Sequence, residues 1–171
     1  MTAPRLRSPL ELRRERRYRR HSCWNHLIAA PLWPKYGVNL GTLLRTCDAV
    51  GACIAVPRRP WIREALEHGN TLRDPACVHW VNGGVTSWLA AQKADSDVIG
   101  VELTDESVRL ADLPAARRRT VMLLGHEREG LPPEALELVD VAVEIPMVGR
   151  GASLNVAVAG SLVLYRLSGM L

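Results

Sequence analysis

The chain has 171 residues, of which 47% are hydrophobic and 23% charged, and its formal net charge is +4. This length and composition favour one globular domain and exclude a disordered chain. No apolar run approaches the roughly eighteen residues that a membrane span needs, and no apolar run follows the basic N-terminus as it would in a secretory signal. We therefore expect a cytoplasmic protein with no membrane partner.

Cysteine usage gives no sign of disulfides or metal. The four cysteines form no C-x-x-C pair and have no histidine at zinc-ligand spacing. They are Cys23, Cys47, Cys53 and Cys77. This pattern is typical of buried thiols in a reducing compartment, and we expect no metal site.

The positive charge is concentrated in residues 1–22, which we predict to be a basic arm in front of a domain over residues 23–171. Residues 1–20 hold eight arginines against Glu11 and Glu15, a local charge of +6, so the rest of the chain sums to −2. Clustered guanidinium groups pair with phosphates, which favours nucleic acid as a partner. The arginines predicted to bind RNA are Arg13, Arg14, Arg16, Arg17, Arg19 and Arg20. A solvated tail, or a helix docked on a partner subunit, is the alternative.

Beyond the arm, short apolar runs alternate with helical patterns. The runs predicted as strands are residues 26–32, 53–56, 78–81, 98–103, 120–124 and 141–145. The predicted helices are residues 40–50, 61–68, 85–94, 133–139 and 154–167. Residues 104–119 are predicted to be a loop. This alternation predicts an α/β fold with a mostly parallel sheet and helices on both faces.

Residues suited to helix capping mark two helix starts. Asn39 stands where an N-cap belongs for the first helix, and Gly51 where that helix should end. Ser153 is the predicted N-cap of the closing helix, which follows a turn containing Gly149 and Gly151. Unpaired N–H groups at such a start suit a small polar ligand.

Polar residues gather where predicted strands end, which is the edge at which parallel sheets bind ligands. They fall in three groups: Asn39 with Arg45, the glycine-flanked residues 125–130, and the turn that ends in Ser153 and Asn155. Neither a dinucleotide-binding glycine motif nor a phosphate-binding loop motif is present.

Three segments carry a resemblance to a known family. Residues 39–52 (NLGTLLRTCDAVGA), 123–132 (LLGHEREGLP) and 145–159 (IPMVGRGASLNVAVA) resemble the three motifs of the SpoU/TrmH branch of the SPOUT RNA methyltransferases, in the same order and at similar spacing. The resemblance implies that residues 23–171 form a SPOUT domain with a C-terminal trefoil knot. It also implies methyl transfer from S-adenosylmethionine to a ribose 2′-hydroxyl of RNA.

The resemblance further implies which residues form the site. The cofactor-binding residues would be Leu103, Gly125, Ile145, Met147, Ser153, Leu154 and Asn155. The catalytic residues would be Arg45, Asn39, Glu127, Ser153 and Asn155. Within this set, Asn39 and Glu127 are expected to hold Arg45 by hydrogen bonds.

The chemistry of the expected reaction constrains the role of Arg45. Methyl transfer is an in-line displacement that depends on alignment of the hydroxyl with the methyl group. A guanidinium cannot readily accept a proton, so Arg45 is expected to anchor a phosphate and to stabilise the developing alkoxide. The base would be a phosphate oxygen, water or Glu127. The structural alternatives are a surface arginine for Arg45, a helix cap for Asn39 and a surface ion pair for Glu127.

The short basic arm favours tRNA over rRNA as the substrate, since rRNA members of the family commonly carry a separate RNA-binding domain. The resemblance also implies a homodimer that packs the closing helix against its mate. The alternatives are an rRNA 2′-O-methyltransferase, a non-catalytic RNA-binding protein of the same fold, and methyl transfer to a base nitrogen. His126 departs from the family pattern, and is expected to be an exposed loop residue or an RNA contact.

Overall fold

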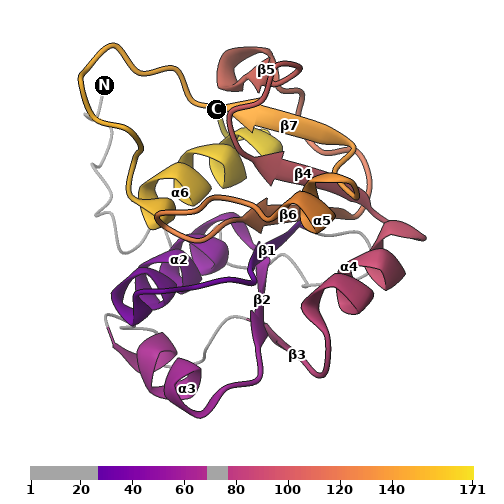
Figure 1. Ribbon diagram of the computed structural model, residues 1–171, viewed down its shortest axis with the longest axis vertical. Coiled ribbons are helices and arrows are strands. Elements are labelled where there is room, and N and C mark those ends of the chain that lie inside the picture. The colour runs from indigo at the N-terminus through magenta and orange to yellow at the C-terminus, as the bar shows by residue number, and fades with distance from the viewer. Residues whose placement is uncertain (1–26, 69–76) are drawn as a thin grey trace, which may run out of the picture.

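The computed structural model describes residues 27–68 and 77–171 (Figure 1). The arm predicted over residues 1–22, with its six candidate RNA-binding arginines, lies outside these described residues. The division into an arm and a domain over residues 23–171 therefore stays a prediction.

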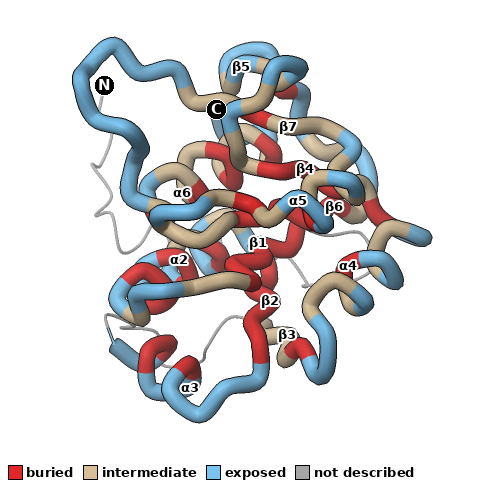
Figure 2. Tube along the Cα trace, viewed as in Figure 1, coloured by how far each residue is buried: buried red, intermediate tan, exposed pale blue. Residues whose placement is uncertain are grey.

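Seven strands form one sheet in the order β3-β2-β1-β6-β4-β7-β5. The strands are β1 (Leu27–Pro31), β2 (Cys53–Pro57), β3 (Val78–Val81), β4 (Asp97–Val101), β5 (Val108–Arg109), β6 (Thr120–Leu124) and β7 (Val141–Glu144). Every neighbouring pair is parallel. The three strands β1, β2 and β6 are buried along their whole length, as expected of parallel strands covered on both faces (Figure 2).

Helices cover both faces of the sheet, which confirms the predicted fold class (Figure 1). They are α2 (Gly37–Val50), α3 (Pro60–Glu67), α4 (Val85–Lys93), α5 (Pro133–Leu136), α6 (Val156–Leu167) and a 3₁₀ turn, η1 (Leu110–Asp112). One core joins the sheet to α2, α3 and α6, and a second joins the opposite face to α4 and α5. None of the helices in the described parts of the chain has the length and apolar character that a membrane crossing requires.

The closing helix packs tightly against the centre of the sheet. A Cβ atom placed on Gly160 of α6 would lie 2.8 Å from Leu124 of β6 and 3.0 Å from Leu43 of α2. Only glycine allows three elements to approach so closely. This contact holds the first half of α6 against the middle of α2 and against β6.

The structure corrects both predicted helix caps. Helix α2 begins at Gly37 with Tyr36 as its N-cap, so Asn39 lies inside the first turn and not before it. Helix α6 is capped by Asn155, not Ser153: Oδ1 of Asn155 accepts hydrogen bonds from N–H of Ala157 and Val158. The predicted end at Gly51 is confirmed, with a left-handed φ of 73°.

The segment predicted to be a loop over residues 104–119 contains the short edge strand β5 and η1. A strand of two residues is too short to show an alternating hydrophobic pattern in the sequence. β5 is recognised only in the structure, where it pairs with β7. The trefoil knot stays a prediction that rests on the resemblance.

Candidate active site

Three segments of the chain meet at β1, where successive connections leave toward opposite edges of the sheet. Strands β2 and β3 lie on one side of β1, whereas β6, β4, β7 and β5 lie on the other. The segments that follow β1 and β6 therefore leave the sheet side by side at its carboxyl edge. Such a switch point is where open parallel sheets bind their ligands.

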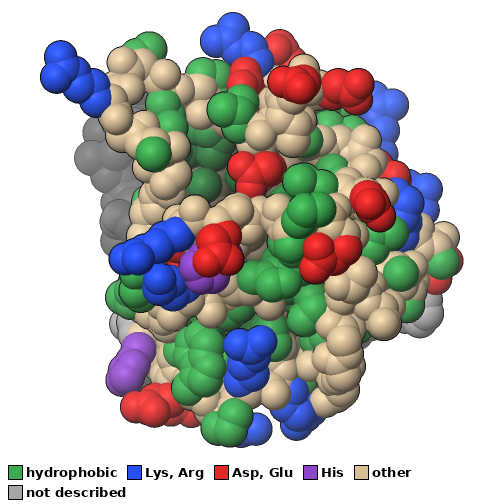
Figure 3. Space-filling view, in the orientation of Figure 1, with side chains coloured by type: hydrophobic (Ala, Val, Ile, Leu, Met, Phe, Trp, Pro, Cys, Tyr) green, Lys and Arg blue, Asp and Glu red, His purple; other side chains and the backbone are tan. Residues whose placement is uncertain are grey.

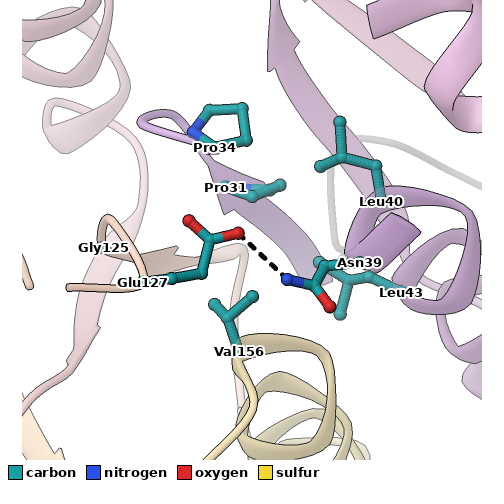
Figure 4. Close-up of a pocket in the computed structure, with 8 residues that line it drawn as sticks. All are labelled: Pro31, Pro34, Asn39, Leu40, Leu43, Gly125, Glu127 and Val156. Carbon is teal, nitrogen blue, oxygen red and sulfur yellow. Dashed lines mark hydrogen bonds between the residues drawn. The ribbon is translucent and has the colours of Figure 1, made fainter. Parts of the chain in front are cut away.

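A chain of hydrogen bonds joins the three loops there. Nδ2 of Asn39 donates to Oε1 of Glu127 at 2.9 Å (Figure 4), and Oδ1 of Asn39 accepts from Nδ2 of Asn155 at 2.9 Å. These residues come from three segments separated by up to 116 positions. The structure thus brings together one residue from each of the three predicted motifs.

The network uses both ends of each amide. Asn39 donates through Nδ2 and accepts through Oδ1, while Asn155 donates through Nδ2 and accepts the two α6 N–H groups through Oδ1. These partners define the orientation of both amides. Asn39 is buried, so the loss of either partner would leave a polar atom unsatisfied.

Glu127 anchors the start of α2. Its carboxylate accepts hydrogen bonds from N–H of Lys35 at 2.9 Å and of Tyr36 at 3.0 Å, in addition to that from Asn39. Partial burial alone would raise the pKa of Glu127, but the hydrogen bonds from Tyr36, Lys35 and Asn39 outweigh it and hold the pKa below its usual value. Glu127 is therefore a structural carboxylate and not a surface ion pair with Arg128.

The loop that carries Glu127 is closed on itself. His126 and Gly130 exchange backbone hydrogen bonds of 2.9 Å, and Nδ1 of His126 accepts from N–H of Arg128 and Glu129. His126 is half-buried and supports the turn through its ring, so it is not the exposed loop residue that the sequence predicted.

Glu102, which directly follows β4, was not among the predicted site residues. Its carboxylate accepts from N–H of Leu131 at 2.9 Å and holds the end of the 125–131 loop. Gly130 has a φ of 72°, and a Cβ atom there would lie 2.3 Å from the same carboxylate. No motif marks this contact, because it joins residues 29 positions apart.

Arg45 does not join the network. Its side chain is exposed on α2 and makes no hydrogen bond or ion pair within the described parts of the chain. The expectation that Asn39 and Glu127 hold Arg45 is therefore wrong. Six residues of α-helix turn the chain by about 240° relative to Asn39, so the two side chains leave different faces of α2.

The predicted cofactor residues gather at one edge. Leu103, Gly125 and Ile145 follow β4, β6 and β7, which are neighbours in the sheet. Residues 146–155, which hold the other four, form an exposed loop that leads into α6 (Figure 2). A narrow crevice beside them is lined by Pro31, Pro34, Asn39, Leu40, Leu43, Gly125, Glu127 and Val156 (Figure 4).

The loop from Ile145 to Leu154 leaves its backbone available. Within the part of the chain that the structure describes, none of its N–H or C=O groups takes part in a hydrogen bond. Apolar side chains stand exposed around it: Leu103 is 72% exposed, Met147 43% and Leu154 39%. Apolar surface beside unpaired backbone groups is the usual makeup of a small-molecule site.

A second hollow lies between α2 and α6. It has a volume of about 340 Å³ and is mostly apolar. Its lining residues are Thr42, Ala157, Val158, Ser161, Leu162, Tyr165 and Leu171. A hydrogen bond of 2.8 Å between the hydroxyls of Thr46 and Ser161 ties the two helices together beside it.

One group of side chains within the described residues has the types and proximity of metal ligands. Cys53 on β2, His79 on β3 and Cys77, directly before β3, place their ligand atoms within 4.8 Å of one another. Cys77 and His79 are in hydrogen-bond contact at 3.4 Å, so the sulfur and the ring nitrogen have each other as partners. The sequence spacing hid this group because it forms across two strands.

The parallel sheet, the polar network at its switch point and the open loop before α6 are the features of an α/β protein with a candidate small-ligand site at the carboxyl edge. The sequence model of the SpoU rRNA methylase family matches residues 33–165, most of the chain. The chain belongs to this family, which confirms the resemblance found in its three motifs.

Two curated relatives and one solved structure show the extent of the similarity. The chain is 30% identical to tRNA (guanosine(18)-2′-O)-methyltransferase of Aquifex aeolicus over 74% of its own length and 61% of that protein. It is 30% identical to 23S rRNA (guanosine(2553)-2′-O)-methyltransferase RlmP of Bacillus subtilis over 77% of its length and 53% of that protein. An AdoMet-bound rRNA methyltransferase from Sinorhizobium meliloti matches with a TM-score of 0.71 and 26% identity, over 86% of this chain and 57% of that one. The chain thus spans about half to three fifths of these relatives.

Proposed function

We propose that the protein transfers a methyl group from S-adenosylmethionine to a ribose 2′-hydroxyl of RNA, with tRNA as the preferred substrate. The observation that carries this proposal is the Asn39–Glu127–Asn155 network, which unites the three family motifs at one edge of the sheet. Similarity to tRNA and rRNA 2′-O-methyltransferases supports it.

The open loop fits the cofactor. Unpaired backbone groups of residues 145–154 can hydrogen-bond the adenine and the amino-acid ends, and Leu103, Met147 and Leu154 can cover the apolar surfaces. Gly125, Ile145, Ser153 and Asn155 complete the set that we assign to the cofactor. When bound, S-adenosylmethionine supplies the electrophilic methyl group.

Arg45 provides a fixed positive charge for the reaction. Its exposed guanidinium has no partner among the described residues, so it is available to hold an RNA phosphate and to stabilise negative charge on the ribose oxygen. Asn39 lies in the first turn of α2, the helix that also carries Arg45, and Ser153 lies in the loop assigned to the cofactor.

Glu127 is poorly suited to be the base. It already accepts three hydrogen bonds, and its lowered pKa makes it a weak proton acceptor. We therefore assign proton removal to a phosphate oxygen or to water. Glu127 acts as a positioning residue that holds the loops together.

The hollow between α2 and α6 supports the proposed homodimer. Val158 is 50% exposed and Leu171 is 65% exposed, and both line an apolar surface that a second copy of α6 would cover. Arg45 follows Thr42 by about one turn of α2, so it lies near this surface. We also propose a cytoplasmic location.

The proposal is tested by two measurements on the full chain. Calorimetry should show S-adenosylmethionine binding, and tRNA transcripts should accept labelled methyl groups faster than rRNA fragments do. The Arg117→Gln variant, which changes an exposed residue before β6, serves as the control for Arg45→Gln. Absence of cofactor binding would contradict the proposal and would favour a non-catalytic RNA-binding protein.

A further inference from the structure

A tryptophan flanked by two arginines lies at the carboxyl ends of β2 and β3. The Cζ atoms of Arg58 and Arg63 lie 5.7 Å and 5.6 Å from the centre of the Trp80 ring. Arg58 follows β2, Arg63 belongs to α3, and Trp80 lies near the end of β3. Three separate segments thus converge on one ring, which we call the arginine–tryptophan platform.

Hydrogen bonds to the end of β3 and to Asn82 hold the platform in place. N–H of Arg58 donates to the carbonyl of Val81 at 2.9 Å, and its Nε donates to Oδ1 of Asn82 at 2.6 Å. Nδ2 of Asn82 in turn donates to the carbonyl of Trp80 at 3.4 Å. These contacts orient one guanidinium over the ring while the side chain remains exposed.

Charge remains available at this surface. Arg58 and Arg63 are exposed, and neither forms an ion pair with a described residue. Glu64 and Glu67 lie on the same helix but do not pair with them. Figure 3 shows Lys and Arg side chains next to hydrophobic ones at the lower edge, where Figure 1 places α3 and the loop after β2.

The platform is continuous with the active site. A Cβ atom on Gly37, at the start of α2, would lie 2.7 Å from Ala65 and 3.7 Å from Trp61 of α3. Trp61 is 37% exposed. On the other side of Gly37, Nζ of Lys35 lies 5.4 Å from the Tyr36 ring, and both backbone N–H groups bind Glu127.

We propose that the arginine–tryptophan platform binds an RNA strand that flanks the target nucleotide. Arg58 and Arg63, which lie over the half-buried ring of Trp80, would contact phosphates, and the exposed ring of Trp61 would offer a surface for an unpaired base. Arginine next to exposed aromatic rings is the arrangement by which proteins hold single-stranded nucleic acid. The inference rests on the proposed function, because it takes RNA as the substrate of the neighbouring site.

The platform should act on RNA affinity and not on the chemical step. It lies on the β2 and β3 side of β1, whereas the proposed cofactor residues follow β4, β6 and β7. Variants of the platform should therefore raise the apparent KM for RNA and leave kcat and cofactor affinity unchanged.

The test measures RNA binding across a salt series with a pool of unmodified tRNA transcripts. The Arg58→Gln/Arg63→Gln double variant should raise the Kd about tenfold and lower the slope of log K against log salt by about 1.4 to 1.8. Trp61→Leu should raise the Kd several-fold with an unchanged slope, because it removes an exposed stacking surface but no charge.

The control is Arg117→Gln/Arg118→Gln, which removes the same formal charge next to the amino end of β6, where Arg118 forms an ion pair of 3.5 Å with Asp97. An unchanged Kd and slope in the platform variant, or an equal loss in the control, would overturn the inference. Because the experiment measures the Kd for RNA, its result does not depend on methyl transfer. If the wild-type protein binds RNA but transfers no methyl group, the proposed function is refuted and the platform is not. The RNA affinities of the platform variants then decide whether the platform binds RNA.

Discussion

Replacement of Glu127 by glutamine should loosen the junction of the three loops. The substitution keeps the shape of the side chain and replaces one acceptor oxygen by an NH₂ group. That group must face a donor, since all three partners of Glu127 donate: N–H of Lys35, N–H of Tyr36 and Nδ2 of Asn39. At least one hydrogen bond is lost, and the others no longer involve a charge.

The size of the effect follows from these contacts. A hydrogen bond to a charged group contributes about 1.5–3 kcal/mol, and a neutral one about 0.5–1.5 kcal/mol. Glu127 is half-buried, so water compensates for part of the loss. We expect Glu127→Gln to lower the free energy of unfolding by about 1.5–3 kcal/mol at pH 7.

Urea denaturation of wild type and variant from pH 3 to pH 7 measures this difference. Because the folded state lowers the pKa of Glu127, its contribution is complete above the ordinary glutamate pKa of about 4.3. The contribution is lost as the pH falls through the lower pKa of the folded state. The difference between the two proteins should therefore be constant near neutrality and shrink in acid.

Two comparisons make the measurement specific. The pKa of Asp140 is also low, because hydrogen bonds from Lys93 and from N–H of Val98 outweigh its partial burial. The pH dependence of wild-type stability alone would therefore combine the contributions of Glu127 and Asp140. Glu129→Gln is the control, since that exposed side chain makes no hydrogen bond in the described parts of the chain. Equal stability of Glu127→Gln and wild type across the pH range would refute the network as a structural junction.

Further predictions concern other parts of the proposed site. Arg45→Ala should lower kcat at least 100-fold with little change in the Kd for S-adenosylmethionine, because it removes charge from the transition state and not from the cofactor; weak cofactor binding with normal turnover would contradict this role. Asn155→Ala should lower the free energy of unfolding by about 1–2 kcal/mol, because it removes the α6 cap and the bond to Asn39, and urea titration would show it. Deletion of residues 1–20 should raise the Kd for tRNA and flatten its salt dependence, and an unchanged slope would remove the arm from the RNA site. The Cys–Cys–His group should hold no stoichiometric zinc in purified protein, as its sulfur and nitrogen already pair; one equivalent by elemental analysis would reverse this expectation.

Six of the seven strands were predictable because they are apolar runs bounded by turns, whereas β5 was not. β6 has the predicted bounds of residues 120–124, and β7 differs by one residue. The start of α2 was misplaced because its local signal, Asn39, is used elsewhere: the carboxylate next to that start comes from Glu127, about 90 positions away. Local pattern cannot show a partner at that distance.

The sequence predicted which motifs form the site, but not which side chains are in contact within it. Asn39, Glu127 and Asn155 were expected together, and the structure joins them by hydrogen bonds. The sequence could not indicate that Glu102 closes the glycine-flanked loop, because that contact depends on the neighbouring ends of β4 and β6.

The most direct test of the proposed chemistry is the identity of the methylated nucleoside. Purified protein would be incubated with unmodified tRNA transcripts and labelled S-adenosylmethionine, and the RNA digested and analysed by mass spectrometry. We expect the label on a 2′-O-methylribose, and none with Arg45→Ala. A label on a base nitrogen would contradict the alignment of cofactor and ribose, and no label on any RNA tested would contradict the enzyme itself.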